Sequence, residues 1–160
     1  MVLNSIGKKS GALEEVRRQI ELVGNEKGIW RDRLLLLYGV LSSPEDDTGR
    51  AVLESLVETG TNHEWMEMGL RLLTSRFKVS EKITLFLDNI LQMPDHKLSE
   101  TILVMRLKLA LELEQNAVAE RCALRIMEEF PGSPQKPAAI RALAAAAGQR
   151  AAHRAATARY

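Results

Sequence analysis

Apolar residues recur every three or four positions in a series of segments along this sequence, and a capping or breaking residue separates each segment from the next. This spacing places the apolar side chains of one segment on one face of an α-helix. Pro44, Pro94 and Pro131 mark the clearest breaks, because proline cannot continue a helix from within. We therefore predict an all-α fold of about eight helices, over residues 11–23, 27–41, 46–59, 62–76, 80–93, 99–113, 116–130 and 134–147.

The composition favours the same fold class. Hydrophobic residues make up 46% of the chain but aromatic residues only 4%, so the core must consist mainly of Leu, Ile, Val, Met and Ala. Such a core suits helices better than a β-sandwich. Cys122 is the only cysteine, which excludes an internal disulfide and fits a reducing compartment.

The termini differ from the middle of the chain. Residues 1–10 show no periodicity and are predicted to be flexible, whereas residues 11–147 are predicted to form a single domain. Residues 148–160 are predicted to be an Ala/Arg-rich tail, with Gly148 ending the last helix. No apolar run follows a basic start near the N-terminus, and none is long enough to span a bilayer. These features lead us to expect a cytoplasmic protein.

The predicted helices fall into two interleaved sets with a common spacing. One set starts near residues 12, 46, 80 and 116, and the other starts near 27, 62, 99 and 134. A constant advance of about 35 residues is typical of stacked helical hairpins, because one hairpin buries only one face and the next hairpin covers the other. We therefore predict an α-solenoid of about four antiparallel helical hairpins.

Several residues match a known repeat pattern. Trp65, Met68, Gly69 and Leu72 have the spacing W-x2-L-G-x2-Y, and Pro94 follows at the expected distance. Further matches are Trp30, which lies 35 residues before Trp65, and the later residues Leu103, Leu107, Ala110, Ala119, Ala123 and Phe130-Pro131. Over residues 27–134 the chain thus resembles the tetratricopeptide repeat family. A related solenoid or an irregular helical bundle would give similar signals.

The resemblance implies a right-handed superhelix in which the first helix of each hairpin lines a concave groove. Those helices would be 27–41, 62–76 and 99–113. Positions on the far side of the signature residues would point into the groove, namely Arg31, Leu35, Tyr38, Met66, Leu70, Leu73, Val104, Lys108 and Leu111. Two interpretations stay open: an apolar groove that captures a peptide or helix of another protein, or ordinary core in a short, tight superhelix.

We accordingly expect a non-catalytic protein–protein interaction module, such as a scaffold, an adaptor or a chaperone-like binder. Arg71 and Arg106 lie one repeat apart and form either a basic stripe or two solvated side chains.

The chain carries a formal charge of +1, so no overall field attracts nucleic acid or membrane. From Lys136 onward, however, the residues include five basic side chains and no acidic one. One alternative is therefore anion or nucleic-acid binding through this tail. A second alternative is self-association into a homo-oligomer.

No residue pattern indicates catalysis. His63, His96 and His153 are far apart in the sequence and do not have the spacing of metal ligands. Asp95-His96 followed by Ser99 is better explained as a turn and a helix cap than as a catalytic set. Cys122 lies on an apolar stripe and is expected to be a buried structural thiol. We therefore predict no catalytic residue, no metal and no cofactor.

Overall fold

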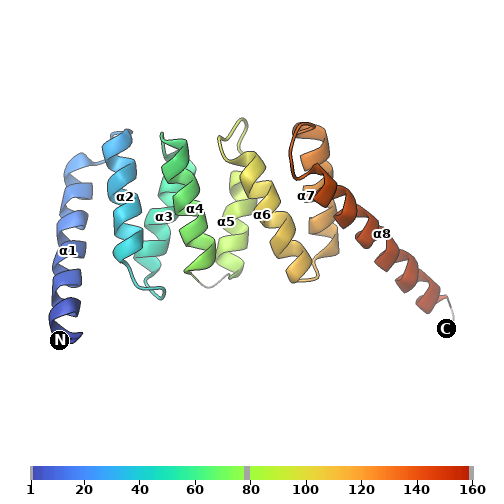
Figure 1. The fold of residues 1–160 in the computed structure, drawn as a ribbon, viewed down its shortest axis with the longest axis horizontal. Helices are drawn as coiled ribbons and strands as arrows, with labels where there is room; N and C mark the ends of the chain where they lie inside the picture. The colour runs from blue at the N-terminus through green and yellow to red at the C-terminus, as the bar shows by residue number, and fades with distance from the viewer. Residues whose placement is uncertain (1, 78–79, 159–160) are drawn as a thin grey trace. The chain divides into compact units, whose positions relative to one another are not determined.

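The computed structural model describes the backbone of residues 2–77 and 80–158, and the side chains of residues 7–77 and 80–158. Figure 1 shows these residues as α-helices joined by short loops, and no strand occurs among them. The all-α prediction is therefore confirmed. The helices are α1 (Val2–Val23), α2 (Ile29–Leu41), α3 (Asp47–Thr59), α4 (His63–Ser75), α5 (Glu81–Ile90), α6 (Ser99–Glu112), α7 (Asn116–Glu129) and α8 (Lys136–Thr157).

The chain divides into two compact units, Met1–Phe86 and Leu87–Tyr160, and the division falls within α5. This differs from the predicted single domain over residues 11–147. Contacts between helices gather among α1–α4 in the first unit and among α6–α8 in the second. The repeat spacing locates where helices begin, but it does not report how extensively each pair packs.

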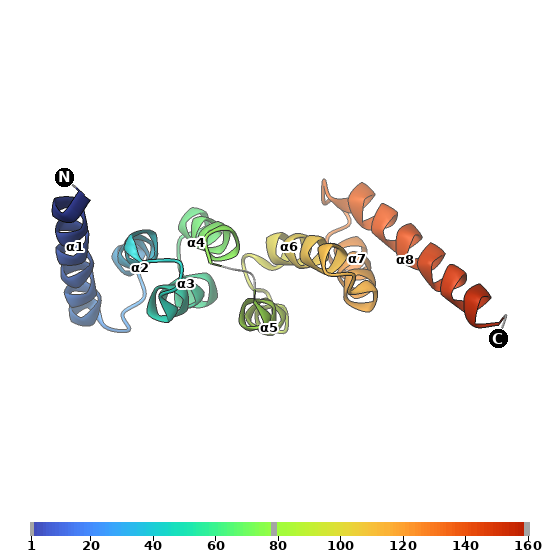
Figure 2. The same cartoon turned by 90° about the horizontal axis from the view of Figure 1, so that it is seen from below.

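In the first unit, α1 packs on α2, α2 on α3, and α3 on α4, and α2 also contacts α4. Figure 2 shows α2 and α4 in one row with α3 against one side of that row. Leu53, Leu56 and Val57 of α3 are fully buried at this contact. Their burial supplies much of the apolar stabilisation of the unit.

Two glycines allow the close approach of α2 and α4 to α3. A Cβ atom at Gly39 of α2 would lie 2.3 Å from Leu53 Cδ2, and one at Gly69 of α4 would lie 2.9 Å from Leu56 Cδ2. Both distances are shorter than carbon atoms tolerate. The leucines of α3 therefore occupy the space that a larger residue would need.

Local signals in the sequence explain several helix ends. Asp46 accepts a hydrogen bond from Thr48 N at 2.9 Å, and Asn62 accepts one from Trp65 N at 3.0 Å. Both side chains are therefore N-caps of the kind that Asp and Asn favour. Gly24 follows the last residue of α1 and has φ of 58°. This is the left-handed conformation expected of a glycine at the end of a helix.

In the second unit, α6 packs on α7 and α7 packs on α8. Figure 1 shows successive helices of this unit running in opposite directions. Small side chains line these contacts, and Ala110, Ala119, Ala123 and Ala139 are fully buried. Ala119 and Ala123, which match the repeat pattern, are small enough to let neighbouring helices approach closely.

Both ends of the chain are more helical than predicted. α1 begins at Val2, within the segment predicted to be flexible, and α8 continues through Gly148 as far as Thr157. The predicted helix break at Gly148 is therefore wrong. One glycine costs a helix only about 1 kcal/mol relative to alanine, and alanines surround this one. Arg159 of the predicted tail lies outside the described residues. No helix of the described chain is both long and apolar enough to cross a membrane.

Candidate functional site

Five of the nine predicted groove residues lie in the core of the first unit. Each is no more than 6% exposed; they are Leu35, Tyr38, Met66, Leu70 and Leu73. Side chains that are already buried within the chain cannot line an open groove, so the groove assignment is wrong for these five. The interpretation as ordinary core holds instead.

The other four predicted groove residues have different surroundings. Arg31 is half-buried and donates to Ser55 Oγ at 3.0 Å and Thr59 Oγ1 at 3.2 Å, so its guanidinium holds α2 against α3. In α6 of the second unit, Val104 is half-buried, whereas Lys108 is exposed and Leu111 is 43% exposed. Only Lys108 and Leu111 are therefore exposed among the nine predicted groove residues.

The predicted basic stripe does not form. Arg71 is exposed, with its guanidinium 3.8 Å from Glu67 Oε2. Arg106 is only 3% exposed; its Nε donates to Asp88 Oδ1 at 2.8 Å and its Nη1 donates to Gln115 Oε1 at 3.2 Å. Arg106 is thus a buried link between α5, α6 and the turn before α7, and the stripe prediction is wrong for it.

The exposed side of α2 is strongly apolar. Trp30 is 67% exposed, Ile29 54%, Leu37 43% and Val40 41%. The remaining member of this surface is Arg33, whose guanidinium carbon lies 5.6 Å from the centre of the Trp30 ring. These five residues, Ile29, Trp30, Arg33, Leu37 and Val40, are called the α2 face below.

The α2 face lies on the side of α2 that is turned away from α3, because Gly39 and Arg31 contact α3 from the opposite side. α4 packs beside α2, and Arg76 at its end donates a hydrogen bond to Val40 O. Met68 of α4 is also 49% exposed. Monomeric domains seldom leave such large apolar side chains grouped in water unless they form a contact site.

The apolar spacing of α2 does not identify its buried side. Trp30, Leu34, Leu37 and Leu41 form one stripe at helical spacing, but the buried residues of α2 are Asp32, Leu35, Tyr38 and Gly39. Apolar residues occur on nearly every side of α2, so periodicity alone does not select the buried side. Gly39 was the available signal, since a glycine within a helix often marks a close contact with a neighbouring helix.

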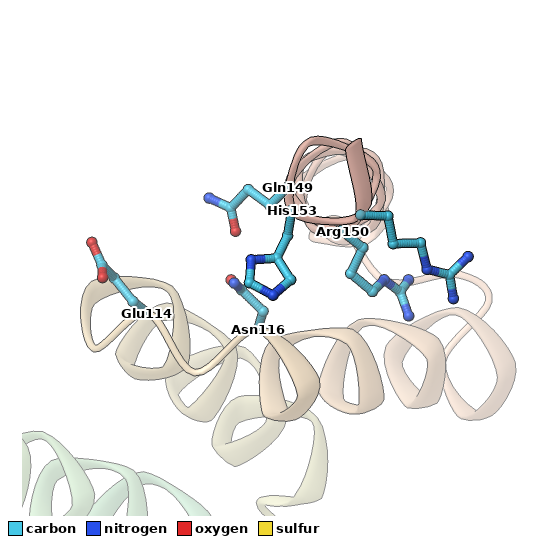
Figure 3. Close-up of a pocket in the computed structure, with 6 residues that line it drawn as sticks. Glu114, Asn116, Gln149, Arg150 and His153 are labelled. Carbon is cyan, nitrogen blue, oxygen red and sulfur yellow. The ribbon is translucent and has the colours of Figure 1, made fainter. Parts of the chain in front are cut away.

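The second unit contains a polar cleft of about 540 Å³ between the start of α7 and the second half of α8. Figure 3 shows His153 pointing from α8 towards Asn116, the first residue of α7. Six residues line this α7–α8 cleft: Glu114, Asn116, Gln149, Arg150, His153 and Arg154. Beside it, Arg150 Nη2 donates to Glu120 Oε1 at 2.7 Å.

Comparisons of the chain with known protein families, with curated proteins and with solved structures found no match. The resemblance to the tetratricopeptide repeat family therefore depends on the motif residues alone. Among them, Gly69 is buried against Leu56, whereas Met68 is half-exposed.

Cys122 and His96 occupy structural positions. Cys122 is 5% exposed, and its burial raises the pKa of the thiol, which keeps it neutral and a poor nucleophile at neutral pH. His96 Nδ1 accepts a hydrogen bond from Leu98 N at 3.2 Å, within the turn that leads into α6. This contact agrees with the interpretation of Asp95-His96 as part of a turn.

Proposed function

We propose that this protein is a non-catalytic protein–protein interaction module that binds an amphipathic helix of a partner on the α2 face. The observation that carries the proposal is the exposure of Ile29, Trp30, Leu37 and Val40 along one side of a single helix. Tryptophan is among the side chains that supply most of the binding energy of an interface, and the apolar side chains around it exclude water. An amphipathic helix offers apolar anchors at the same three- and four-residue spacing.

Charge indicates what should flank those anchors in the partner. Arg33 is the only charged residue of the α2 face, and Arg76 lies at its end, beside Val40. No carboxylate pairs with either arginine among the residues that the structure describes. A partner helix with Glu or Asp beside its apolar stripe would therefore gain favourable electrostatic contacts and faster association.

A scaffold of stacked hairpins forms part of the same proposal. The spacing of about 35 residues and the packing of Gly69 against α3 support a tetratricopeptide-like, right-handed superhelix. The proposed contact surface differs from the groove that this resemblance implied, because five of the six residues expected in that groove in the first unit are core.

A peptide-binding experiment tests the proposal. The probe is a synthetic amphipathic peptide of about 18 residues, with Leu at helical spacing and Glu on both sides of the apolar stripe. A peptide of the same composition in scrambled order serves as the control. In the Trp65→Phe variant, Trp30 is the only tryptophan, so its fluorescence should shift to shorter wavelength as the peptide covers it.

Matched variants identify the surface. Trp30→Glu combined with Leu37→Glu should weaken binding at least about thirtyfold and leave the helical circular dichroism unchanged. Leu85→Glu is the control, since Leu85 is 59% exposed in α5 and lies outside the α2 face. Equal binding by the double variant, or no binding of the ordered peptide up to about 1 mM, would refute the proposal.

A second copy of the chain is the other partner to be tested on the α2 face. If two copies of the chain cover each other's α2 face, the mass measured by analytical ultracentrifugation should rise with concentration in the unaltered protein. Trp30→Glu should then yield a monomer at every concentration. That result would identify a second copy of the chain, and not a helix of another protein, as the partner of the α2 face.

A further inference from the structure

We propose that the α7–α8 cleft of the second unit binds a phosphate group, as free phosphate or as a small phosphate monoester. This site is independent of the α2 face, because all of its lining residues belong to α8, to α7 or to the turn before α7. The proposal depends on the nitrogen donors that line this cleft, which is large enough for a small ligand.

The donors come from two facing elements. Gln149 and His153 lie one helical turn apart on α8, as do Arg150 and Arg154, so the members of each pair share one side of that helix. Asn116 contributes a side-chain amide from the opposite wall, where His153 points towards it (Figure 3). Arginine forks, amides and an imidazole N–H match the several acceptor oxygens of a phosphate.

The local electrostatics favour an anion. α8 contains Lys136, Arg141, Arg150 and Arg154 and no acidic residue. The first turn of α7 contains no acidic residue, and Asn116 at its start lines the cleft, so the partial positive charge of this helix end lies beside the cleft. Glu114 is the one acidic residue that lines the cleft, and it lies across from Arg150 in Figure 3.

The arginines are positioned to bind a ligand. The ion pair with Glu120 fixes Arg150 at the edge of the cleft through Nη2 alone, which leaves its other nitrogen atoms as donors. Arg154 has no ion pair among the described residues. A phosphate between these two side chains would receive charge-assisted hydrogen bonds from both.

The cleft suits a small ligand better than a nucleic-acid strand. Its volume of about 540 Å³ accommodates a phosphate with a modest organic group. None of its described lining residues is Phe, Tyr or Trp, so it lacks the stacking platform on which proteins hold single-stranded bases.

The test uses the full chain and titrates it with inorganic phosphate and, separately, with phosphoserine, following backbone amide signals by NMR. The expected result is a saturable shift of amides at the start of α7 and in the second half of α8. Tighter binding of phosphoserine would identify a monoester as the ligand, and equal binding would identify free phosphate.

Charge-matched variants make the test specific. Arg154→Gln and His153→Gln should each weaken phosphate binding roughly tenfold. Glu114→Gln should strengthen binding severalfold, because it removes the acidic side chain from the cleft. Arg141→Gln removes the same charge from the same helix outside the cleft and should leave binding unchanged.

Three outcomes would overturn the proposal. The first is the absence of saturable shifts, and the second is an equal loss of affinity in Arg141→Gln and Arg154→Gln, which would indicate only the diffuse charge of α8. The third is preferential binding of single-stranded RNA, with a steep salt dependence and equal effects of both arginine variants. That result would indicate polyelectrolyte contact along the helix.

Discussion

At the scale of single residues, Asp32 is the most constrained polar side chain of the first unit. Its carboxylate is fully buried, and Oδ2 accepts hydrogen bonds from Thr61 N at 2.7 Å, Asn62 N at 2.8 Å and Thr61 Oγ1 at 2.9 Å. These bonds connect α2 to the turn that begins α4. Removing a buried acceptor destabilises the folded state, because its donors lose their hydrogen bonds.

We expect Asp32→Ala to lower the free energy of unfolding by about 2–4 kcal/mol, because it leaves the Thr61 and Asn62 amides without their acceptor. Urea denaturation monitored by circular dichroism measures the change. Glu58→Ala on the exposed side of α3 is the control and should change the value by less than about 0.5 kcal/mol. An unchanged midpoint for Asp32→Ala would show that water replaces the carboxylate without cost.

Cys122 gives a prediction about pH. Burial raises the pKa of its thiol above the value of 9.0 expected in the unfolded chain. The unfolded state therefore releases the proton first, so the contribution to stability is complete below pH 9.0 and is lost as the pH rises through the folded pKa.

The comparison of the unaltered chain with Cys122→Ala isolates this effect. The difference in their unfolding free energies should be constant in neutral buffer and should shrink as the pH rises above 9.0. Tyr38, whose pKa burial also raises, is present in both proteins and cancels from the difference. A difference that stays constant in alkaline buffer would mean that the folded and unfolded thiols titrate alike.

At the scale of helices, the sequence predicted where elements begin and end better than which side of each is buried. Asp46 and Asn62 act at short range, so their capping roles follow from the sequence. The buried side of a helix depends instead on its neighbours. α4 has two apolar stripes, one that begins at Trp65 and one that begins at Met66. The contact with α3 buries the stripe that begins at Met66.

This selection determines the effect of substitutions in α4. Leu70→Glu together with Leu73→Glu should unfold the first unit, because both side chains are fully buried and a buried carboxylate costs several kcal/mol. Met68→Glu is the control on the same helix and should leave the unit folded, since Met68 is 49% exposed. We therefore expect helical circular dichroism to decrease in the double variant and to stay unchanged in Met68→Glu.

At the scale of the whole molecule, the fold class was predictable because caps, breaks and periodicity all act within a helix or at its ends. The candidate sites were less predictable from the sequence. The pairing of Arg106 with Asp88 and the convergence of Asn116 with His153 join residues far apart in the sequence. Such pairs depend on tertiary packing, which neither spacing nor composition specifies.

Each proposed site is built entirely from residues of one unit: the α2 face belongs to Met1–Phe86 and the α7–α8 cleft to Leu87–Tyr160. The amphipathic peptide should therefore slow amide hydrogen exchange in α2, and phosphate should slow it at the start of α7 and in α8. Trp30→Glu should abolish only the first effect, and Arg154→Gln should weaken only the second. Loss of phosphate protection in Trp30→Glu would contradict this assignment, because that substitution changes no residue of the cleft.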